Sequence, residues 1–451
     1  DPNEANIPFK PKHHFPVRTA GVKEGDFAMI MGYPGSTDRF LSSHGVKMAL
    51  DIEQPSRVKI RRAKLDIYEE FMDRDNATRI KYASKHAQVS NYWKYFIGQQ
   101  RGLKRLKVYD QKKAQETELM AWVNAKEERK ARYGSILTDL ESGYNERTKF
   151  EKANVYMQEA AFGSEMIILG FRMYGLKMQL ANDPKDAAKV AAAVARVQAA
   201  ADELWKDYVP AIDEKVTATM FRMIHDDVER DLQPSVMNTI EKKYKSDFNA
   251  WAAAMFKTSV LTNKARLDAF LAKPSLKVLD KDLGFQAAES CLNHYRSFLA
   301  PAVAAGEEDL ARGYRLMVGA MREKDPNKSW YPNANSTMRL TYGTVGSYIP
   351  GDGMFYKHIC TAAGILEKED PTNDEFIVPA RQKELLMKKD YGRYADENGD
   401  LVVTFISNND ITGGNSGSGV FNGNGELIGI AFDGNWEAMS GDIAFEPELQ
   451  R

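Results

Sequence analysis

The stretch "NNDITGGNSGSGVFNGNGELIGIAFDGNWE", residues 408–437, decides how the rest of the chain is interpreted. Its serine, Ser416, lies among glycines directly before an apolar run. Acyl transfer requires a hydroxyl on a tight, exposed turn, with backbone N–H groups directed at the developing oxyanion, and glycine permits that backbone shape. We therefore predict that Ser416 is a nucleophile and that the N–H groups of Gly414 and Ser416 form its oxyanion hole. The alternative is a glycine-rich turn with an uninvolved serine.

A hairpin is predicted immediately after this serine. In "GVFNGNGELIGIAF" (419–432), two apolar runs are joined by Asn-Gly-Asn-Gly, whose residues tolerate positive φ. In double-barrel serine peptidases, the second strand of such a hairpin lines the substrate cleft. Asp433 and Gly434, which are 17 and 18 residues after Ser416, are then placed to face a substrate.

Glycine usage divides the chain into three segments. Residues 51–330 hold only 11 of the 32 glycines, and glycine is unfavourable inside helices. The stretches 150–180 and 186–208 in this block have helical apolar spacing or are rich in alanine. We therefore predict an α+β fold in which a β domain, formed by residues 1–50 and 331–451, is interrupted by an all-α, bundle-like insertion over residues 51–330.

The flanking segments contain short runs typical of strands. These runs are "DFAMIMGYPG" (26–35), "STMRLTYGTVGSYI" (336–349) and "DLVVTFISNND" (400–410).

Composition excludes several classes of function. The formal net charge is −1, so there is no basic field to attract nucleic acid or an anionic membrane. No apolar window is long enough for a membrane span. The two cysteines, Cys291 and Cys360, are too few for a disulfide framework or a zinc site, and they can be paired or free. No metal-ligand spacing such as His-Glu-x-x-His is present.

Several motifs together resemble one peptidase family. "NDITGGNSGSGVFNGNGELIGIAFDGNWEAMSGDI", "PFKPKHHFPV" followed by "VKEGDFAMIMGYPGSTDRF", and "VSNYWKYFIG" (89–98) are similar to segments of the bacterial dipeptidyl-peptidases called seven and eleven. Members of that family are chymotrypsin-like serine exopeptidases with an inserted helical domain. The resemblance implies that residues 1–50 lead into the second β-barrel of a double barrel, that residues 51–330 are a helical cap, and that residues 331–451 carry the nucleophile.

The resemblance also assigns roles to single residues. Ser416 matches the nucleophile, and Gly414 matches a donor of the oxyanion hole. Asp433 and Asn91 match the residues that hold the free α-ammonium group of the substrate. Gly434 stands where eleven-type members carry an arginine, which implies a seven-type preference for apolar or aromatic side chains at P1, the residue before the cleaved bond. Gly419 departs from the family, which usually has proline there.

Asp410 supports a competing specificity. It lies six residues before Ser416, where a trypsin-like enzyme holds the acidic base of its pocket. This spacing alone predicts cleavage after Lys or Arg, whereas the surrounding motif is shared by family members of different specificity.

The partners of a catalytic serine are missing from the predicted β domain. Chymotrypsin-like triads run His, Asp, Ser along the chain. The chain has seven histidines, which are His13, His14, His44, His86, His225, His294 and His358. None of them lies in the context of a first barrel, so the resemblance places the catalytic histidine and aspartate upstream of residue 1. His44 is the candidate base if the resemblance is misleading. The start at Asp1-Pro2, without Met or a leader, leads us to expect a fragment that is inactive alone.

The resulting hypothesis is a serine exopeptidase that releases dipeptides from the free N-terminus of oligopeptides. The resemblance further implies a homodimer in the periplasm or at the cell surface of a Gram-negative bacterium, with no metal or organic cofactor. Two alternatives stay open: a non-enzymatic, peptide-binding helical protein with a degenerate peptidase barrel, and a trypsin-like endopeptidase.

Overall fold

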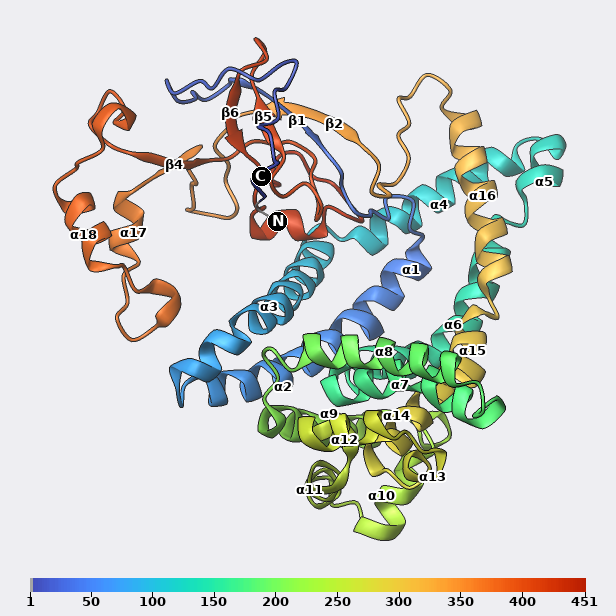
Figure 1. The fold of residues 1–451 in the computed structure, drawn as a ribbon. Coiled ribbons are helices and arrows are strands. Elements are labelled where there is room, and N and C mark those ends of the chain that lie inside the picture. Colours follow the sequence, from blue (N-terminus) through green and yellow to red (C-terminus); the bar gives the residue numbers. More distant parts are fainter. Residues whose placement is uncertain (1–2) are drawn as a thin grey trace. The chain divides into compact units, whose positions relative to one another are not determined.

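The computed structural model describes residues 3–451, so Asp1 and Pro2 of the predicted leading segment lie outside the described residues. The described chain is mostly helical and carries small antiparallel sheets (Figure 1). It divides into two compact units. Unit 1 comprises residues 1–40, 101–106 and 329–451, and unit 2 comprises residues 41–100 and 107–328. The predicted division into a leading segment, a cap and a second barrel stays a prediction.

Unit 1 is built on a four-stranded antiparallel sheet with the strand order β2-β1-β5-β6 (Figure 1). In register, Met29 of β1 lies opposite Tyr342 of β2 on one side and opposite Phe421 of β5 on the other. A separate antiparallel pair joins β3 to β4. The strands are β1 (Phe27–Gly32), β2 (Arg339–Thr344), β3 (Ile359–Thr361), β4 (Val402–Phe405), β5 (Gly419–Phe421) and β6 (Leu427–Ile430).

The strands expected from the sequence form where the apolar runs predicted them. The run 26–35 gives β1, and the hairpin predicted over 419–432 is the pair β5–β6. Alternation along β1 buries Ala28 and Ile30, which pack with Val345, Val420 and Ala431 in a small core. This core lies beside the loop that carries the predicted nucleophile. A closed chymotrypsin-like barrel stays a prediction.

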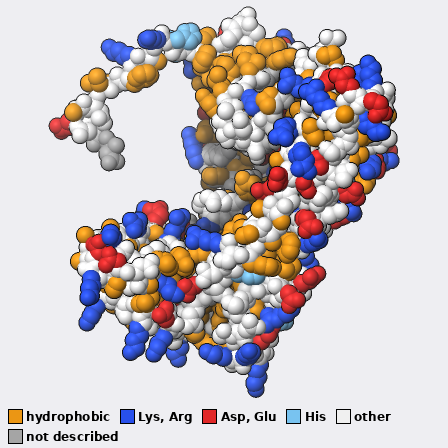
Figure 2. Space-filling model, turned by 90° about the vertical axis from the view of Figure 1, so that its right-hand side faces the viewer, with side chains coloured by type: hydrophobic (Ala, Val, Ile, Leu, Met, Phe, Trp, Pro, Cys, Tyr) orange, Lys and Arg blue, Asp and Glu red, His pale blue; other side chains and the backbone are white. Residues whose placement is uncertain are grey.

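The segment before β1 is exposed. Every residue from Asn3 to Ala20 is exposed, and the start of the segment extends into solvent (Figure 2). Contacts near the end closest to β1 hold it: Val17 pairs with Leu427 at the edge of β6, and the ring centres of Phe15 and Phe421 are 4.5 Å apart. The sheet therefore gains a short parallel addition next to β6.

Unit 1 also contains short helices. They are α17 (Ala363–Glu367), α18 (Ala380–Met387), η6 (Asp374–Phe376), η7 (Gly392–Tyr394) and η8 (Trp436–Ser440). The last residues of α3 (Asn76–Arg105), from Arg101 onward, also group with unit 1.

Unit 2 consists of helices around one large apolar core. Trp251, Tyr156, Phe221 and Phe285 are among its fully buried side chains. Apart from α3, its helices are α1 (Ser43–Met48), η1 (Ala49–Glu53), α2 (Gln54–Met72), α4 (Val108–Asn124), α5 (Glu127–Tyr133), α6 (Ile136–Glu159), η2 (Ala161–Gly163), α7 (Glu165–Asn182), α8 (Ala187–Leu204), α9 (Pro210–Asp227), η3 (Arg230–Leu232), α10 (Val236–Tyr244), α11 (Phe248–Thr258), η4 (Val260–Thr262), α12 (Lys264–Ala272), α13 (Leu276–Leu279), α14 (Leu283–His294), η5 (Tyr295–Leu299), α15 (Ala300–Ala304) and α16 (Glu307–Lys324).

The helical stretch expected over 150–180 is two helices. Helix α6 ends at Glu159 and α7 starts at Glu165, because Ser164 caps the new helix through its side chain. The carboxylate of Asp213 accepts hydrogen bonds from the N–H groups of Glu165 and Met166, at 3.0 and 2.8 Å. Capping by a residue 47 positions away is a long-range event that apolar spacing does not predict.

Candidate active site

The predicted nucleophile lies on a tight, exposed loop of unit 1. The loop runs from the end of β4 to the start of β5, and Ser416 is exposed on it. Two short turns shape it: the N–H of Asn415 donates to the carbonyl of Thr412 at 3.1 Å, and the N–H of Ser418 donates to that of Asn415 at 3.0 Å. The N–H of Gly417 donates to the carbonyl of Ala431 at 2.8 Å, which ties the loop to the end of β6.

Asn415 acts as the internal anchor of this loop. Its side chain is buried, with 2% exposure, and its Oδ1 accepts a hydrogen bond from the N–H of Thr412 at 3.1 Å. A Cβ added at Gly32 would lie 2.6 Å from the Asn415 amide nitrogen, so a larger residue at this strand end would force the buried amide to shift. Asn415 therefore turns inward while Ser416 turns outward.

Gly414 is required by both conformation and space. Its φ is +106°, a region that side chains rarely adopt. A Cβ there would meet the backbone nitrogen of Gly35 at 2.8 Å and would approach the carbonyl oxygen of Tyr33 even more closely. The loop thus lies directly on the backbone that follows β1, and the N–H of Gly35 donates to the carbonyl of Gly413 at 2.7 Å.

The two predicted oxyanion donors are open. Among the hydrogen bonds of residues 3–451, none is donated by the N–H of Gly414 or by the N–H of Ser416. The Ser416 hydroxyl is 3.5 Å from the carbonyl oxygen of Phe432, a long contact at the edge of hydrogen-bonding distance. A hydroxyl without a strong partner beside two open donors is suited to acyl transfer.

No base from unit 1 is hydrogen-bonded to this serine within the described residues. The ring of His358 lies 3.9 Å from the carboxylate of Glu24, and the ring of His13 packs against Phe15, next to His14. The histidines of unit 2 have partners of their own: His44 stacks on Tyr144, His86 bonds Glu69, His225 bonds Asp226, and His294 bonds the carbonyl of Leu232.

Asp433 and Gly434 follow β6 in unit 1. Asp433 is exposed, and its Oδ1 accepts a hydrogen bond from the N–H of Gly434 at 2.8 Å. A Cβ at Gly434 would lie 3.1 Å from the Cβ of Ala438, so an added side chain needs a small shift of η8. The side chain of Asn435 fixes this turn by accepting from the N–H of Ala438 at 2.9 Å.

Asn91, the other predicted contact for a substrate N-terminus, lies on α3 in unit 2. Its side chain is exposed. Since Asn91 and Asp433 belong to different units, their predicted cooperation stays a prediction.

Asp410 has a partner that sequence reasoning missed. The guanidinium of Arg39 donates to both of its carboxylate oxygens, at 2.9 and 2.7 Å. The two residues are 371 positions apart, and no local pattern marks Arg39 as important. Because the carboxylate of Asp410 is already paired, the structure argues against Asp410 as the open base of a trypsin-like pocket.

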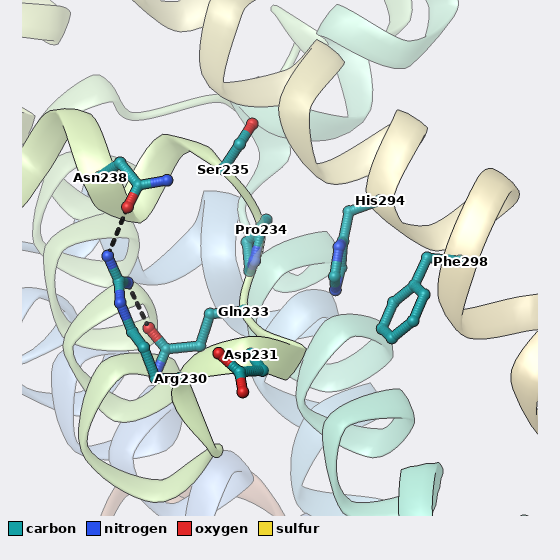
Figure 3. Close-up of a pocket in the computed structure, with 8 residues that line it drawn as sticks. All are labelled: Arg230, Asp231, Gln233, Pro234, Ser235, Asn238, His294 and Phe298. Carbon is teal, nitrogen blue, oxygen red and sulfur yellow. Dashed lines mark hydrogen bonds between the residues drawn. The ribbon is translucent and has the colours of Figure 1, made fainter.

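A cavity of about 370 Å³ lies in unit 2 (Figure 3). Its lining residues are Arg230, Asp231, Gln233, Pro234, Ser235, Asn238, His294 and Phe298. The charge of Arg230 is engaged there by Asn238, Gln233 and Glu241. None of the predicted site residues lines this cavity.

Residues 3–451 contain no group of three or more His, Cys, Asp or Glu side chains arranged to hold a metal ion. No helix within these residues combines the length and the apolar character that a membrane span requires. Cys291 is buried, Cys360 is exposed, and both are free thiols.

Comparisons with known proteins identify the family of this chain. Residues 1–451 match the family described as Peptidase S46. The chain is 42% identical over 457 residues to dipeptidyl-peptidase 7 of Porphyromonas endodontalis, covering 100% of this chain and 54% of that protein. It is 35% identical over 458 residues to the Asp/Glu-specific dipeptidyl-peptidase of Flavobacterium psychrophilum, covering 99% of this chain and 62% of that protein.

A solved structure shows the same fold. The crystal structure of Porphyromonas endodontalis DPP11 in complex with the dipeptide Arg-Glu superposes with a TM-score of 0.90 at 30% identity, covering 100% of this chain and 64% of that chain. The chain thus spans between about half and two thirds of the length of these relatives. The resemblance noted from the sequence motifs is confirmed: this chain belongs to the peptidase S46 family, alongside proteins named dipeptidyl-peptidase 7 and Asp/Glu-specific dipeptidyl-peptidase.

Proposed function

We propose that this chain carries the nucleophile of a serine exopeptidase that releases dipeptides from the free N-terminus of oligopeptides. The observation that carries this proposal is the loop of Ser416, an exposed hydroxyl beside the open N–H groups of Gly414 and Ser416, in a chain of the S46 family. The Ser416 oxygen attacks the second peptide carbonyl, and the two N–H groups bind the oxyanion. Collapse expels the shortened peptide as an amine, and water then hydrolyses the acyl-enzyme.

The base for this attack is proposed to come from outside these 451 residues. Unit 1 supplies no histidine to Ser416 within the described residues, and the relatives are longer than the stretch that matches. A histidine takes the proton of the serine and returns it to the leaving amine, while an aspartate orients it. The 451-residue chain alone is therefore expected to be inactive.

Dipeptide counting is proposed to depend on the charged end of the substrate. Asp433 offers an exposed carboxylate, and Asn91 offers an amide oxygen, to the α-ammonium group. Charge-assisted hydrogen bonds of this kind are short and strong, so such acceptors distinguish a free N-terminus from an internal peptide.

We also propose that the enzyme is a homodimer in the periplasm or at the cell surface of a Gram-negative bacterium.

The proposed P1 preference is apolar or aromatic and rests on Gly434, which adds neither charge nor bulk beside η8. The chain is also more similar to the relatives named dipeptidyl-peptidase 7, at 37–42% identity, than to those named Asp/Glu-specific, at 31–35%. An acidic preference is the competing outcome.

The test uses the full-length protein and peptides with either a free or an acetylated N-terminus. Dipeptide release from the free peptide only, abolished by Ser416→Ala, is the expected result. An endopeptidase cuts both peptides, and a binding protein cuts neither. Cleavage by the purified 451-residue chain would contradict the proposed external base.

Specificity is measured on dipeptidyl substrates with Leu, Phe, Asp, Glu, Lys or Arg at P1. Gly434→Arg should raise the Asp and Glu rates relative to Leu, whereas Gly434→Ala, the matched variant without charge, should not. An equal effect of both variants would refute the role of Gly434.

A further inference from the structure

The ion pair between Arg39 and Asp410 is unusually well formed for unit 1. Its two hydrogen bonds are 2.9 and 2.7 Å long and join the two fork nitrogens to the two carboxylate oxygens. The side chain of Arg39 is 12% exposed and that of Asp410 is 29% exposed. A bidentate pair with little solvent around the arginine is stronger and more directional than a surface ion pair.

The arginine is fixed by its surroundings as well as by Asp410. Its guanidinium lies 5.5 Å from the centre of the Phe445 ring and 3.5 Å from the hydroxyl of Tyr331. Its backbone N–H donates to Oδ1 of Asn333 at 2.9 Å. These contacts, together with Asp410, fix the position of the Arg39 guanidinium.

The same chain segment supports the nucleophile loop. Residues 33–39 follow β1, and Gly35 and Tyr33 lie directly against Gly413 and Gly414. Four residues further along, Arg39 meets Asp410, which is six residues before Ser416. The ion pair and the nucleophile thus lie on the two ends of one short loop that packs on one short segment.

The pairing of Arg39 with Asp410 has the donor and acceptor geometry of a contact between an arginine side chain and an acidic pocket. A guanidinium bound bidentately by a carboxylate is what a trypsin-like pocket forms with an arginine side chain of its substrate. Here the protein supplies both partners. The guanidinium of Arg39 neutralises the negative charge of Asp410, so the carboxylate offers little electrostatic attraction to a cationic substrate side chain.

We propose that Arg39 is a specificity-determining residue, an internal occupant of the acidic site formed by Asp410 that excludes cationic P1 side chains. The role in specificity rests on the proposed peptidase function, but the binding of charged ligands at the Arg39–Asp410 pair can be tested without catalysis. Removing one partner leaves the charge of the other without its main counterpart, and the sign of that charge selects the ligand.

The first experiment measures binding to the 451-residue chain. Arg39→Met keeps the length of the side chain and removes its charge, and Asp410→Asn keeps the shape of its side chain and removes its charge. Benzamidine and benzoate are nearly isosteric probes of opposite charge. By calorimetry, Arg39→Met should bind benzamidine at least tenfold more tightly than the unaltered chain, Asp410→Asn should gain benzoate binding, and the double variant should gain neither.

The second experiment measures kcat/KM in the full-length protein. Arg39→Met should raise the ratio of Lys and Arg over Leu at P1 by tenfold or more, and Asp410→Asn should raise the ratio of Asp and Glu over Leu. A purely structural pair would lower all rates together and leave these ratios unchanged.

The outcomes separate the two proposals. Absence of dipeptide release by the unaltered full-length protein refutes the peptidase, while probe binding still decides the charge site. If folded Arg39→Met gains no benzamidine affinity and Asp410→Asn gains no benzoate affinity, the inference is overturned. If Arg39→Met does not fold, Asp410→Asn with benzoate decides alone.

Discussion

Replacing single glycines of the loop that carries Ser416 by alanine separates conformational strain from steric overlap. Three glycines of one loop offer a graded series. Gly413 has no positive φ and nothing within 4 Å of an added Cβ. Gly417 has a φ of +85° and open space, whereas Gly414 combines a φ of +106° with a backbone nitrogen 2.8 Å from the added Cβ.

The magnitudes follow from these two features. A non-glycine residue held at positive φ costs about 1–2 kcal/mol, and a forced overlap in a packed site costs about 1–3 kcal/mol more. Backbone atoms are the obstacle at Gly414, so no side chain can rotate to relieve it. We expect a loss of about 2–5 kcal/mol for Gly414→Ala, about 1–2 kcal/mol for Gly417→Ala, and less than about 0.5 kcal/mol for Gly413→Ala.

Calorimetric unfolding of the 451-residue chain provides the assay. Unit 1 falls in the size range where 1 kcal/mol shifts Tm by about 2–4 °C, so Gly414→Ala should lower the transition of unit 1 by about 4–20 °C. The transition of unit 2 is the internal reference. Equal Tm values for Gly413→Ala and Gly414→Ala would refute the reasoning, because they would show that the loop relaxes freely.

Two further predictions concern buried groups of unit 2. Burial, as the larger cause, and the charge of Glu165 raise the pKa of Asp213 to about 6. The folded state therefore holds this proton more tightly than the unfolded chain, in which an Asp has a pKa of about 3.9. The resulting stabilisation is complete below about pH 4 and is lost as the pH rises through 6, so Asp213→Asn should flatten the free energy of unfolding between pH 4 and 6 in denaturant titrations. Burial raises the pKa of the Cys291 thiol, whereas Cys360 is exposed; iodoacetamide at pH 8 should label only Cys360 in the native chain and both thiols in denaturant, and native labelling of Cys291 would show that its burial is wrong.

Local rules account for the parts that the sequence predicted. The strand Phe27–Gly32 follows from a short apolar run that ends at Pro-Gly, and the hairpin after Ser416 follows from its Asn-Gly-Asn-Gly connection. Gly414 was predicted for its backbone donor, and the structure adds that positive φ and close packing require a glycine there. Each of these features depends on residues within a few positions of one another.

The parts that escaped prediction depend on pairs far apart in the chain. The bond from Arg39 to Asp410 spans 371 positions, and the cap that Asp213 places on α7 spans 47. A charged residue near a turn is usually solvated, so neither Arg39 nor Asp213 differs in sequence from an ordinary surface residue. The burial of Asn415 was not predicted, because its neighbour Ser416 marks the loop as an exposed element.

Asn415 and Arg39 together anchor the exposed loop that carries the proposed nucleophile. An exposed turn normally exchanges conformations, because solvent can replace its hydrogen bonds. Here the loop is held beneath its surface at two places, by a buried amide one residue before Ser416 and by an ion pair six residues before it. The hydroxyl and the two open N–H groups can therefore face solvent without losing their positions. Since preorganised donors stabilise an oxyanion only when they need not reorganise, the function proposed for Ser416 depends on the buried contacts beneath the loop as well as on the exposed serine.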